Sequence, residues 1–344
     1  MARSAAKSFV FSVVGATGVV GREMVSLLSS RKFPLKALRL AASERSQNQT
    51  VEFNGEEIAV RRLAPELFAG SDFVFFTAGA AVSREFVPVA ARAGALVIDN
   101  TSAFRMDADV PLAVPEVNAH TLDQVPERRI VSVPNCAAIQ MAVALGPLHE
   151  HALIRRIVVS TFQSTSGAGR RAMEELSRQV TDLFNYRETK NEVFPERIAF
   201  NLIPHIGDFA ESGETGEEIK ICEETKKILG DSSIGVSVTA VRVPTFHGHA
   251  VSINVETKKS VTPEEARAVL SKAKSIRLID DRNSRRYPVL ADAVGQDTVC
   301  VGRIRADSSR KNCLNLWVVA DNLRKGAALN AIQIAEHFVA KELI

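Results

Sequence analysis

The stretch FVFSVVGATGVVGREMVSLL, residues 9–28, decides the fold of the first part of the chain. It predicts a buried strand, a tight glycine turn and an amphipathic helix, in that order. Gly15, Gly18 and Gly21 have the G-x-x-G-x-x-G spacing of a turn whose backbone lies against a pyrophosphate at a helix start. A glycine-rich turn that binds no ligand has the same local pattern. The candidate cofactor-binding residues are Gly15, Ala16, Thr17, Gly18, Val19, Val20 and Gly21.

Strand and helix patterns alternate from residue 8 to about residue 133. The apolar runs predict strands at 9–14, 37–41, 73–77, 95–98 and 130–133, and helices at 19–30 and 81–93. Asn54 and Gly55 form a hairpin signal, which predicts a small antiparallel insertion. The whole pattern is typical of an α/β protein with a doubly wound, Rossmann-like parallel sheet.

The pattern changes after residue 136. Apolar and polar residues alternate in RRIVVSTFQS, SIGVSVTAVRV and AVSINVETK, which is typical of antiparallel strands with one buried face. Helices are predicted at about 169–186, 215–229, 263–274 and 323–342. Thr215 and Glu218 predict a capping box at the start of the second of these helices, and Gly230 predicts its end. We expect a mixed α+β domain here.

Cys136 lies in IVSVPNCAAIQMAVAL, where a strand pattern stops at Pro134 and a helical pattern begins. A thiol in the first turn of a helix lies near unpaired N–H groups and the positive end of the helix dipole, which favour a thiolate. The same N–H groups could stabilise an oxyanion on the group that the sulfur attacks. A buried structural cysteine is the alternative. Together with a nucleotide-binding turn, Cys136 suggests an oxidoreductase that forms a covalent thioester.

Composition excludes several classes of function. The chain has 344 residues, of which 46% are hydrophobic and 24% charged, as expected of a globular protein of two domains. A net charge of +3 is too small to predict nucleic-acid binding. No apolar segment has the length of a signal peptide or a membrane span, so we expect a cytoplasmic protein. The four cysteines (136, 222, 300, 313) have no metal-ligand or disulfide spacing, and we expect no metal.

Ten strings make the chain resemble a known family. In order, they are GATGVVG, LAASERS, VIDNTSAFRM, VPEVN, VPNCAAIQM, STFQSTSGAG, IAFNLIPHI, VRVP followed by GHA, VGRIR and WVVADNLRKGAALNAIQIAE. Over residues 8 to 340 the chain resembles the aspartate-β-semialdehyde dehydrogenases. The resemblance implies NADPH-dependent, reversible conversion of L-aspartyl 4-phosphate to L-aspartate 4-semialdehyde and phosphate, toward lysine, methionine and threonine.

The resemblance also implies two domains and a homodimer. The NADP-binding domain is expected at residues 1–133, completed by the C-terminal helix at 324–344. The catalytic and dimerisation domain is expected at residues 134–323.

The thioester chemistry needs an acid–base, and His247 and His249 are the candidates. Two residues apart on a strand, both would face the same side, so periodicity cannot choose between them. The family motif Gly-His matches His249, which we therefore assign as the acid–base.

Several residues are candidates for binding the substrate. Arg242 lies on the apolar face of its strand, where an arginine is either paired inside the protein or waiting for an anion. Glu217 and Lys220 are three apart on a helix, so an ion pair between them is an alternative to substrate binding. By resemblance, Arg242 binds the α-carboxylate and Glu217 the amino end of the substrate. The resemblance also implies that Arg105 and Lys220 bind phosphate, and that Gln163 and Asn135 orient the acyl group.

The segment LAASERS bears on cofactor choice. Ser43, Arg45 and Ser46 offer a cation and hydroxyls where NAD enzymes have an acidic residue, which favours the 2′-phosphate of NADP. Glu44 would favour NAD if it pointed inward. By resemblance, Asn322 contacts the nicotinamide end.

Two departures from the family involve hydroxyl groups. Ala137 and Ala138 follow Cys136 where the family often has Ser-Thr or Thr-Thr, so hydroxyl help there must come from the backbone. Ala250 follows His249 in place of a common serine.

Three other kinds of protein are alternatives to this family. N-acetyl-γ-glutamyl-phosphate reductase has a Gly-Cys-Tyr-Pro setting that this chain lacks. Glyceraldehyde-3-phosphate dehydrogenase has a different cysteine string and lacks the VRVP and GHA segment. A non-catalytic relative would be expected to lose the cysteine or the histidine, and this chain keeps both.

Overall fold

A computed structural model describes residues 7–46 and 49–344 of the chain. The chain divides into two compact units, one of residues 1–134 with 327–344 and the other of residues 135–326. The sequence placed these junctions at 133/134 and 323/324. Each unit is described by itself below.

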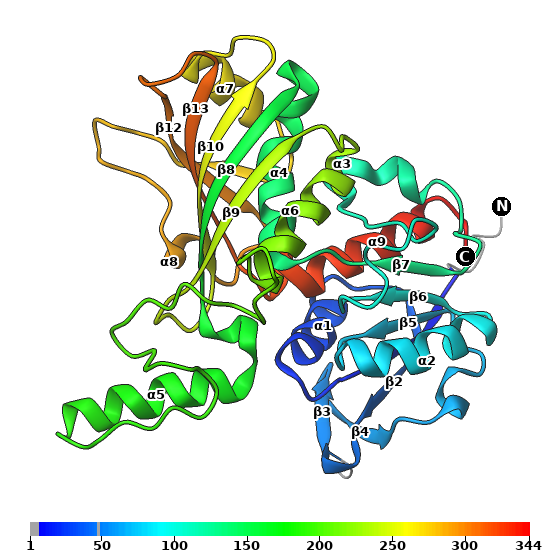
Figure 1. Ribbon diagram of the computed structural model, residues 1–344. Coiled ribbons are helices and arrows are strands. Elements are labelled where there is room, and N and C mark those ends of the chain that lie inside the picture. Colours follow the sequence, from blue (N-terminus) through cyan, green and yellow to red (C-terminus); the bar gives the residue numbers. More distant parts are fainter. Residues whose placement is uncertain (1–6, 47–48) are drawn as a thin grey trace. The chain divides into compact units, whose positions relative to one another are not determined.

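The first unit contains a mainly parallel sheet with the strand order β3-β4-β2-β1-β5-β6-β7 (Figure 1). Its strands are β1 (Phe9–Val14), β2 (Leu35–Ala42), β3 (Thr50–Phe53), β4 (Glu56–Arg62), β5 (Phe73–Phe76), β6 (Leu96–Asp99) and β7 (Ile130–Ser132). Its helices are α1 (Val19–Ser30), α2 (Ala80–Arg92), α3 (Pro115–Asn118) and α9 (Leu329–Ala340), with short 3-10 turns η1 (Glu44–Ser46), η2 (Pro65–Phe68) and η3 (Ala119–Leu122). β3 and β4 form the antiparallel hairpin predicted from Asn54 and Gly55.

Both faces of this sheet are covered, which confirms the doubly wound fold. On one face Phe9, Phe11 and Phe73 pack with Phe33 through edge and stacked ring contacts. Alternate residues of the same strands point to the other face, where Val74 and Phe76 pack in the cluster that holds residues of α2. The continuous apolar strands of the sequence follow from this two-sided burial.

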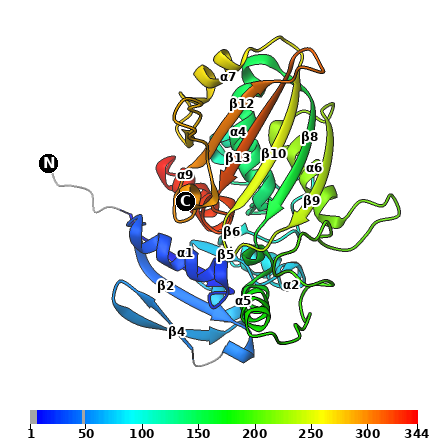
Figure 2. The ribbon, with the colours of Figure 1, turned by 90° about the vertical axis from the view of Figure 1, so that its left-hand side faces the viewer.

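The second unit contains a mixed sheet with the order β11-β12-β13-β10-β8-β9. Its strands are β8 (Ile154–Gln163), β9 (Gly235–Arg242), β10 (His249–Thr257), β11 (Ile276–Leu278), β12 (Val299–Ala306) and β13 (Cys313–Ala320). Its helical segments are α4 (Cys136–Ala152), η4 (Thr165–Ala168), α5 (Arg170–Phe184), α6 (Gly216–Leu229), α7 (Pro263–Leu270) and α8 (Leu290–Ala293). The long strands and α4 lie side by side in both views (Figures 1 and 2), and α4 packs on β8, β10, β12 and β13.

The structure corrects two expectations about this unit and one about the C-terminal helix. β10 is antiparallel to β8 and β13, as expected, but β9 runs parallel to β8. The alternation of apolar and polar residues shows only that one face of a strand is buried. It therefore could not predict whether neighbouring strands pair in parallel or antiparallel. The helix predicted at 263–274 ends at Leu270, and the C-terminal helix begins with a π-helical turn, η5 (Arg324–Ala328), before α9.

None of the helices in the described residues is long and apolar enough to cross a membrane.

Candidate active site

Cys136 is the first residue of α4, as predicted, and its side chain is partly exposed. The next ten residues of α4 are buried, so the helix start is firmly anchored. Burial raises the pKa values of the other three thiols, Cys222, Cys300 and Cys313. Among the cysteines, therefore, only the position of Cys136 combines access with a helix N-terminus.

The N-terminus of α4 is capped by Asn135. Its side-chain oxygen accepts hydrogen bonds from the backbone N–H groups of Ala137 at 2.9 Å and Ala138 at 3.4 Å. These are two of the first-turn N–H groups that the sequence made available for an oxyanion, and Asn135 occupies both. An oxyanion therefore needs a donor other than these two groups.

Helix α6 holds Asn135 in place through two carboxylates. Glu224 Oε2 accepts the backbone N–H of Asn135 at 2.5 Å, and Glu217 Oε1 accepts from Asn135 Nδ2 at 2.8 Å. Gln163 Nε2 donates to the same Glu217 oxygen at 3.1 Å. The capping box predicted at Thr215 and Glu218 is present and fixes the start of α6. The two carboxylates are seven residues, or two turns, apart, and so share one face of the helix.

The register of the sheet brings three predicted residues together. Gln163, at the end of β8, pairs with Arg242 of the parallel strand β9. On its other side Gln163 pairs with His249, the first residue of β10. The orienting amide, the arginine and the histidine therefore stand in a row across three neighbouring strands, and each is buried.

His249 and His247 do not share a face of a strand. Gly248, with a φ of +82°, turns the chain between them, and β10 begins only at His249. His249 is fully buried, whereas His247 is partly exposed. The prediction that both histidines face the same side is wrong, because it assumed that the strand includes His247.

The imidazole of His249 is held from its Nδ1 side. The backbone N–H of Ser164 donates to Nδ1 at 3.1 Å, and the Ser164 hydroxyl lies 3.1 Å from the same atom. Nε2 is buried and has no hydrogen-bond partner among the described residues. Burial first, and then the charge of Arg242, lower the pKa of His249 to about 3, so the ring is neutral near pH 7.

Arg242 is buried as well, and burial lowers its pKa, against the opposing charges of Glu217 and Cys136. Its Nη1 donates to the carbonyl oxygen of Ser164 at 2.7 Å. A Cβ atom at Gly167 would lie 3.1 Å from this Nη1 and 3.3 Å from His249 Nε2. Glycine at this position therefore keeps the space beside both groups open.

Two further residues pack at this site. A Cβ atom at Gly326 would lie 3.0 Å from the Cβ of Cys136, so glycine allows the chain to pass close to the cysteine. Asn322 Oδ1 accepts from the backbone N–H of Gly248 at 2.9 Å and from the Ser164 hydroxyl at 3.3 Å. Asn322 thus holds the turn that precedes His249.

The two predicted phosphate-binding residues differ in setting. Lys220, with 43% of its side chain exposed, lies 4.0 Å from Glu217 Oε2, at the limit of an ion pair. Arg105, in the first unit, is buried after β6, and its Nη2 donates to the carbonyl of Asn100 at 3.1 Å.

The glycine turn of the first unit has the geometry that its spacing predicts. Gly15 has a φ of +90°, a region that favours glycine. A Cβ at Gly21 would lie 2.2 Å from the carbonyl oxygen of Gly15, so α1 can pack on the turn only with glycine there. Gly18 is the N-cap of α1 and supplies no side-chain cap, which leaves the first-turn N–H groups to an anionic ligand. The turn therefore fits a dinucleotide.

The segment after β2 lies beside this turn. Thr17 Oγ1 donates to Ser46 Oγ at 3.1 Å, which joins the turn to η1. Glu44 pairs with Arg62 at 2.7 Å, and both side chains are largely exposed. The backbone of Arg45 lies in η1, but its side chain is outside what the structure describes.

Comparisons with known proteins agree with this geometry. The semialdehyde dehydrogenase NAD binding domain matches residues 11–125, and the semialdehyde dehydrogenase dimerisation domain matches residues 145–325. The chain is 48% identical over 335 residues to the aspartate-semialdehyde dehydrogenase of Aquifex aeolicus, with 97% of this chain and 98% of the relative covered. The chain belongs to the aspartate-semialdehyde dehydrogenase family.

Solved structures of the family have the same fold. The structure of aspartate semialdehyde dehydrogenase II complexed with ASA from Vibrio cholerae has a TM-score of 0.94 and 43% identity, covering 97% of this chain and 99% of that one. Aspartate semialdehyde dehydrogenase with NADP from Candida albicans has a TM-score of 0.78 and 27% identity, covering 98% and 100%. Family membership makes this protein one of a group of oxidoreductases with a nicotinamide cofactor.

Eight of the predicted site residues belong to the second unit: Asn135, Cys136, Gln163, Glu217, Lys220, Arg242, His249 and Asn322. The sequence did not single out Ser164, Gly167 or Glu224. Glu224 could have been found from its two-turn spacing from Glu217. Ser164 and Gly167 had no local signal, since their roles depend on strand register.

Within the described residues, no group of three potential ligands could hold a metal ion.

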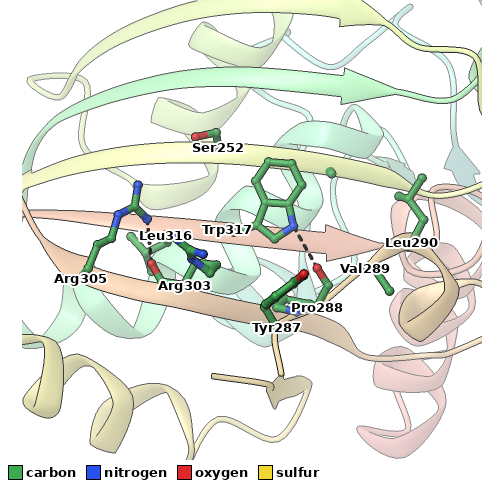
Figure 3. A pocket seen from close by; sticks show the side chains of 10 residues that line it. Ser252, Tyr287, Pro288, Val289, Leu290, Arg303, Arg305, Leu316 and Trp317 are labelled. Atoms are coloured by element: carbon green, nitrogen blue, oxygen red, sulfur yellow. Dashed lines mark hydrogen bonds between the residues drawn. The ribbon is translucent and has the colours of Figure 1, made fainter. Parts of the chain in front are cut away.

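A pocket of about 480 Å³ lies on another part of the second unit (Figure 3). Trp317, Tyr287 and Leu290 line it, and Trp317 Nε1 donates to the carbonyl of Pro288 at 3.0 Å. Ala250 and Ser252 also line it, and they alternate with His249 along β10. The pocket therefore lies on the opposite face of the sheet from the histidine.

Proposed function

We propose that this protein converts L-aspartyl 4-phosphate, NADPH and a proton to L-aspartate 4-semialdehyde, NADP⁺ and phosphate, reversibly. Its place would be in the biosynthesis of lysine, methionine and threonine. The observation that carries the proposal is the row of Arg242, Gln163 and His249, with Asn135 of the Cys136 helix joined to it through Glu217. The Vibrio cholerae relative, whose structure is complexed with ASA, supports this choice of substrate.

We propose Cys136 as the nucleophile. Its sulfur would attack the acyl carbon, phosphate would leave, and a thioester would form. A bound nicotinamide would supply the hydride that reduces this thioester, and the Cys136 sulfur would then leave as the aldehyde is released. The oxyanion at each addition needs a donor, and Ala137 and Ala138 are occupied by Asn135. His249 Nε2, buried and lacking a partner among the described residues, is the donor that we assign.

The substrate's charged groups have separate candidates. We propose that Arg242 binds the α-carboxylate, because its buried charge favours an anionic partner. Glu217 would accept the amino group, and its position is fixed by Asn135 and Gln163. Lys220 and Arg105 would bind the phosphate. Asn135 and Gln163 would orient the acyl group.

We propose NADP(H) as the preferred cofactor. The turn of residues 15–21 would bind the pyrophosphate, and Ser43, Arg45 and Ser46 the 2′-phosphate. Glu44, the residue that would favour NAD, already pairs with Arg62, which reduces its ability to bind a ribose hydroxyl. The Candida albicans relative, whose structure was solved with NADP, supports this choice. Asn322 and Gly326 would contact the nicotinamide end.

We also propose that the protein is a homodimer. The second unit matches a dimerisation domain, and the pocket beside Trp317 has Tyr287 and Val289 with 44% and 42% of their surface exposed. Such apolar groups fit an interface with a second copy. Sedimentation should give twice the chain mass. Val289→Glu should shift the protein toward monomer, and an unchanged mass would argue against this surface.

The reaction is tested by phosphate-dependent reduction of NADP⁺ with aspartate semialdehyde. Wild-type protein should turn over only when all three substrates are present. Cys136→Ala should abolish turnover while NADP⁺ binding is retained, and Cys222→Ala should remain active as the matched control. Near-normal turnover by Cys136→Ala would exclude the thioester mechanism.

A further inference from the structure

Ser164 contacts the Nδ1 atom of His249 through two groups. The backbone N–H and the hydroxyl of Ser164 both lie 3.1 Å from it. Both residues are fully buried. The backbone of Gly248 also interacts with the ring and raises its pKa, against the larger effects of burial and of Arg242.

The backbone N–H fixes the resting tautomer. An amide N–H can only donate, so Nδ1 must offer its lone pair, and a neutral ring then carries its proton on Nε2. This form suits one of the histidine's two tasks. Nε2–H can donate a hydrogen bond to the oxyanion that forms when the Cys136 sulfur adds to a carbonyl.

The second task needs the other tautomer. In the oxidative direction the thiohemiacetal O–H bond breaks, its proton moves to Nε2, and the electron pair forms the C=O bond as hydride leaves for the nicotinamide. Nε2 can accept that proton only if its lone pair is available, so the ring proton must be on Nδ1. The imidazolium that results also carries a proton on Nδ1. Every state in which His249 acts as a base therefore needs an acceptor at this nitrogen.

We propose that the Ser164 hydroxyl is this acceptor, and that by turning it lets His249 change between a hydrogen-bond donor and a base. This rests on the proposed function. A hydroxyl both donates and accepts, whereas the backbone N–H beside it cannot accept. When Oγ accepts from Nδ1–H, its own hydrogen needs another partner, and Asn322 Oδ1 lies 3.3 Å away. Asn322 Oδ1 is itself held by the N–H of Gly248, so this second partner is fixed in place.

Among the described side chains, Ser164 is the one whose hydroxyl is recorded in hydrogen-bond contact with the His249 ring. Ala250, next to His249 in the chain, has no hydroxyl and lines the pocket on the opposite face of the sheet. The charged group that acts on the ring is Arg242 of β9, which opposes its protonation. A hydrogen-bond acceptor at Nδ1 stabilises the protonated ring and so offsets part of the effect of Arg242. Ser164 is thus a positioning residue that acts through His249.

Ser164→Ala tests the proposal, because it removes the hydroxyl and keeps the backbone N–H. The kcat for semialdehyde oxidation should fall roughly ten- to a hundredfold, the loss expected when one buried hydrogen bond to a catalytic base disappears. The KM values for semialdehyde and phosphate should change little. The solvent deuterium isotope effect on kcat should increase, since proton transfer becomes more rate-limiting. Ser164→Thr, which restores a hydroxyl, should recover much of the rate.

Ser166→Ala is the matched control. Ser166 Oγ lies 3.1 Å from the Ser164 hydroxyl, 3.3 Å from Asn322 Oδ1 and 2.9 Å from Asn322 Nδ2. The described hydrogen bonds to His249 Nδ1 come from Ser164 and not from Ser166. It should lose much less kcat and keep the wild-type isotope effect. Alkylation of Cys136 by iodoacetamide should proceed at the wild-type rate in both variants, which shows that the site is intact.

Equal losses in Ser164→Ala and Ser166→Ala, or an unchanged isotope effect in Ser164→Ala, would overturn the proposal. So would full activity of Ser164→Ala. These outcomes differ from failure of the proposed function, in which the wild-type protein itself would not oxidise aspartate semialdehyde.

Discussion

The charge of Arg242 acts on the imidazole of His249, and together with burial, the larger cause, it lowers the pKa of the ring to about 3. Strand pairing produces this relationship, because both residues flank Gln163 in the sheet. A neutral histidine beside a buried arginine can donate from Nε2 without adding a second positive charge.

This arrangement makes stability depend on pH. The ring's pKa is about 3 when folded and roughly 6.5 when unfolded, so the unfolded chain binds the extra proton first as pH falls. The contribution of the buried neutral ring is fully present above about pH 6.5 and is lost toward pH 3, by at most about 1.4 kcal/mol per pH unit. Urea unfolding at pH 7, 6 and 5 should show this slope. In His249→Asn the slope should be shallower, and identical slopes would show that His249 is not the buried titrating group.

The choice between His249 and His247 has a direct kinetic test. Asparagine keeps the polarity of either side chain but cannot titrate near neutral pH. His249→Asn should lose a large part of kcat, roughly a hundredfold or more, as expected for removal of an acid–base. His247→Asn should stay near wild type, because His247 lies outside β10 and is partly exposed. The reverse pattern of losses would show that the assignment is wrong.

Gly167 should be sensitive to the smallest possible addition. An alanine Cβ would lie 3.1 Å from Arg242 Nη1 and 3.3 Å from His249 Nε2, closer than ordinary van der Waals contact. We expect Gly167→Ala to fold normally, since the residue is exposed and does not require a positive φ. Its kcat/KM for aspartate semialdehyde should fall, by up to roughly a hundredfold if the two groups are displaced. Ala168→Gly, next in the chain, is the control, and a similar loss there would point to the loop rather than to the two side chains.

The local elements of this fold were readable from the sequence, whereas the site's closest contacts were not. β1 and α1 were predicted at the bounds observed, and Thr215 and Glu218 predicted a real capping box, because periodicity and caps are properties of neighbouring residues. Ser164 contacts His249 across 85 residues, and the parallel pairing of β8 and β9 is also non-local. The cap by Asn135 was accessible in principle, since asparagine before a helix is a preferred N-cap.

Cofactor preference should depend on Arg45. An arginine contact to the 2′-phosphate contributes about 1.5–3 kcal/mol, or roughly ten- to a hundredfold in preference. Arg45→Ala should therefore raise KM for NADP⁺ and leave the use of NAD⁺ nearly unchanged. Titration calorimetry of both cofactors gives the same comparison without turnover. Arg61→Ala, an exposed arginine on the neighbouring strand β4, serves as the control. Equal losses with both cofactors would mean that Arg45 stabilises the turn instead.

The substrate's two anionic ends should be separable by mutation. In the proposed oxidative reaction phosphate is an independent substrate, so a separate KM can be measured for each of the two anionic groups. Lys220→Ala and Arg105→Ala should chiefly raise KM for phosphate. Lys220 is suited to this because its nearest carboxylate, Glu217, lies 4.0 Å away and is held by Asn135 and Gln163.

Arg242→Lys should chiefly impair the use of semialdehyde. It keeps the positive charge but loses the planar fork, and with it the hydrogen bond from Nη1 to the Ser164 carbonyl. Because the guanidinium is buried, lysine would also leave a desolvated ammonium with fewer donors in position. We expect a loss in kcat/KM for semialdehyde of roughly a hundredfold, from about one to three kcal/mol of lost charge-assisted hydrogen bonding. A rise in KM for phosphate alone would place Arg242 at the other end of the substrate and reverse the arrangement of the two cation sites.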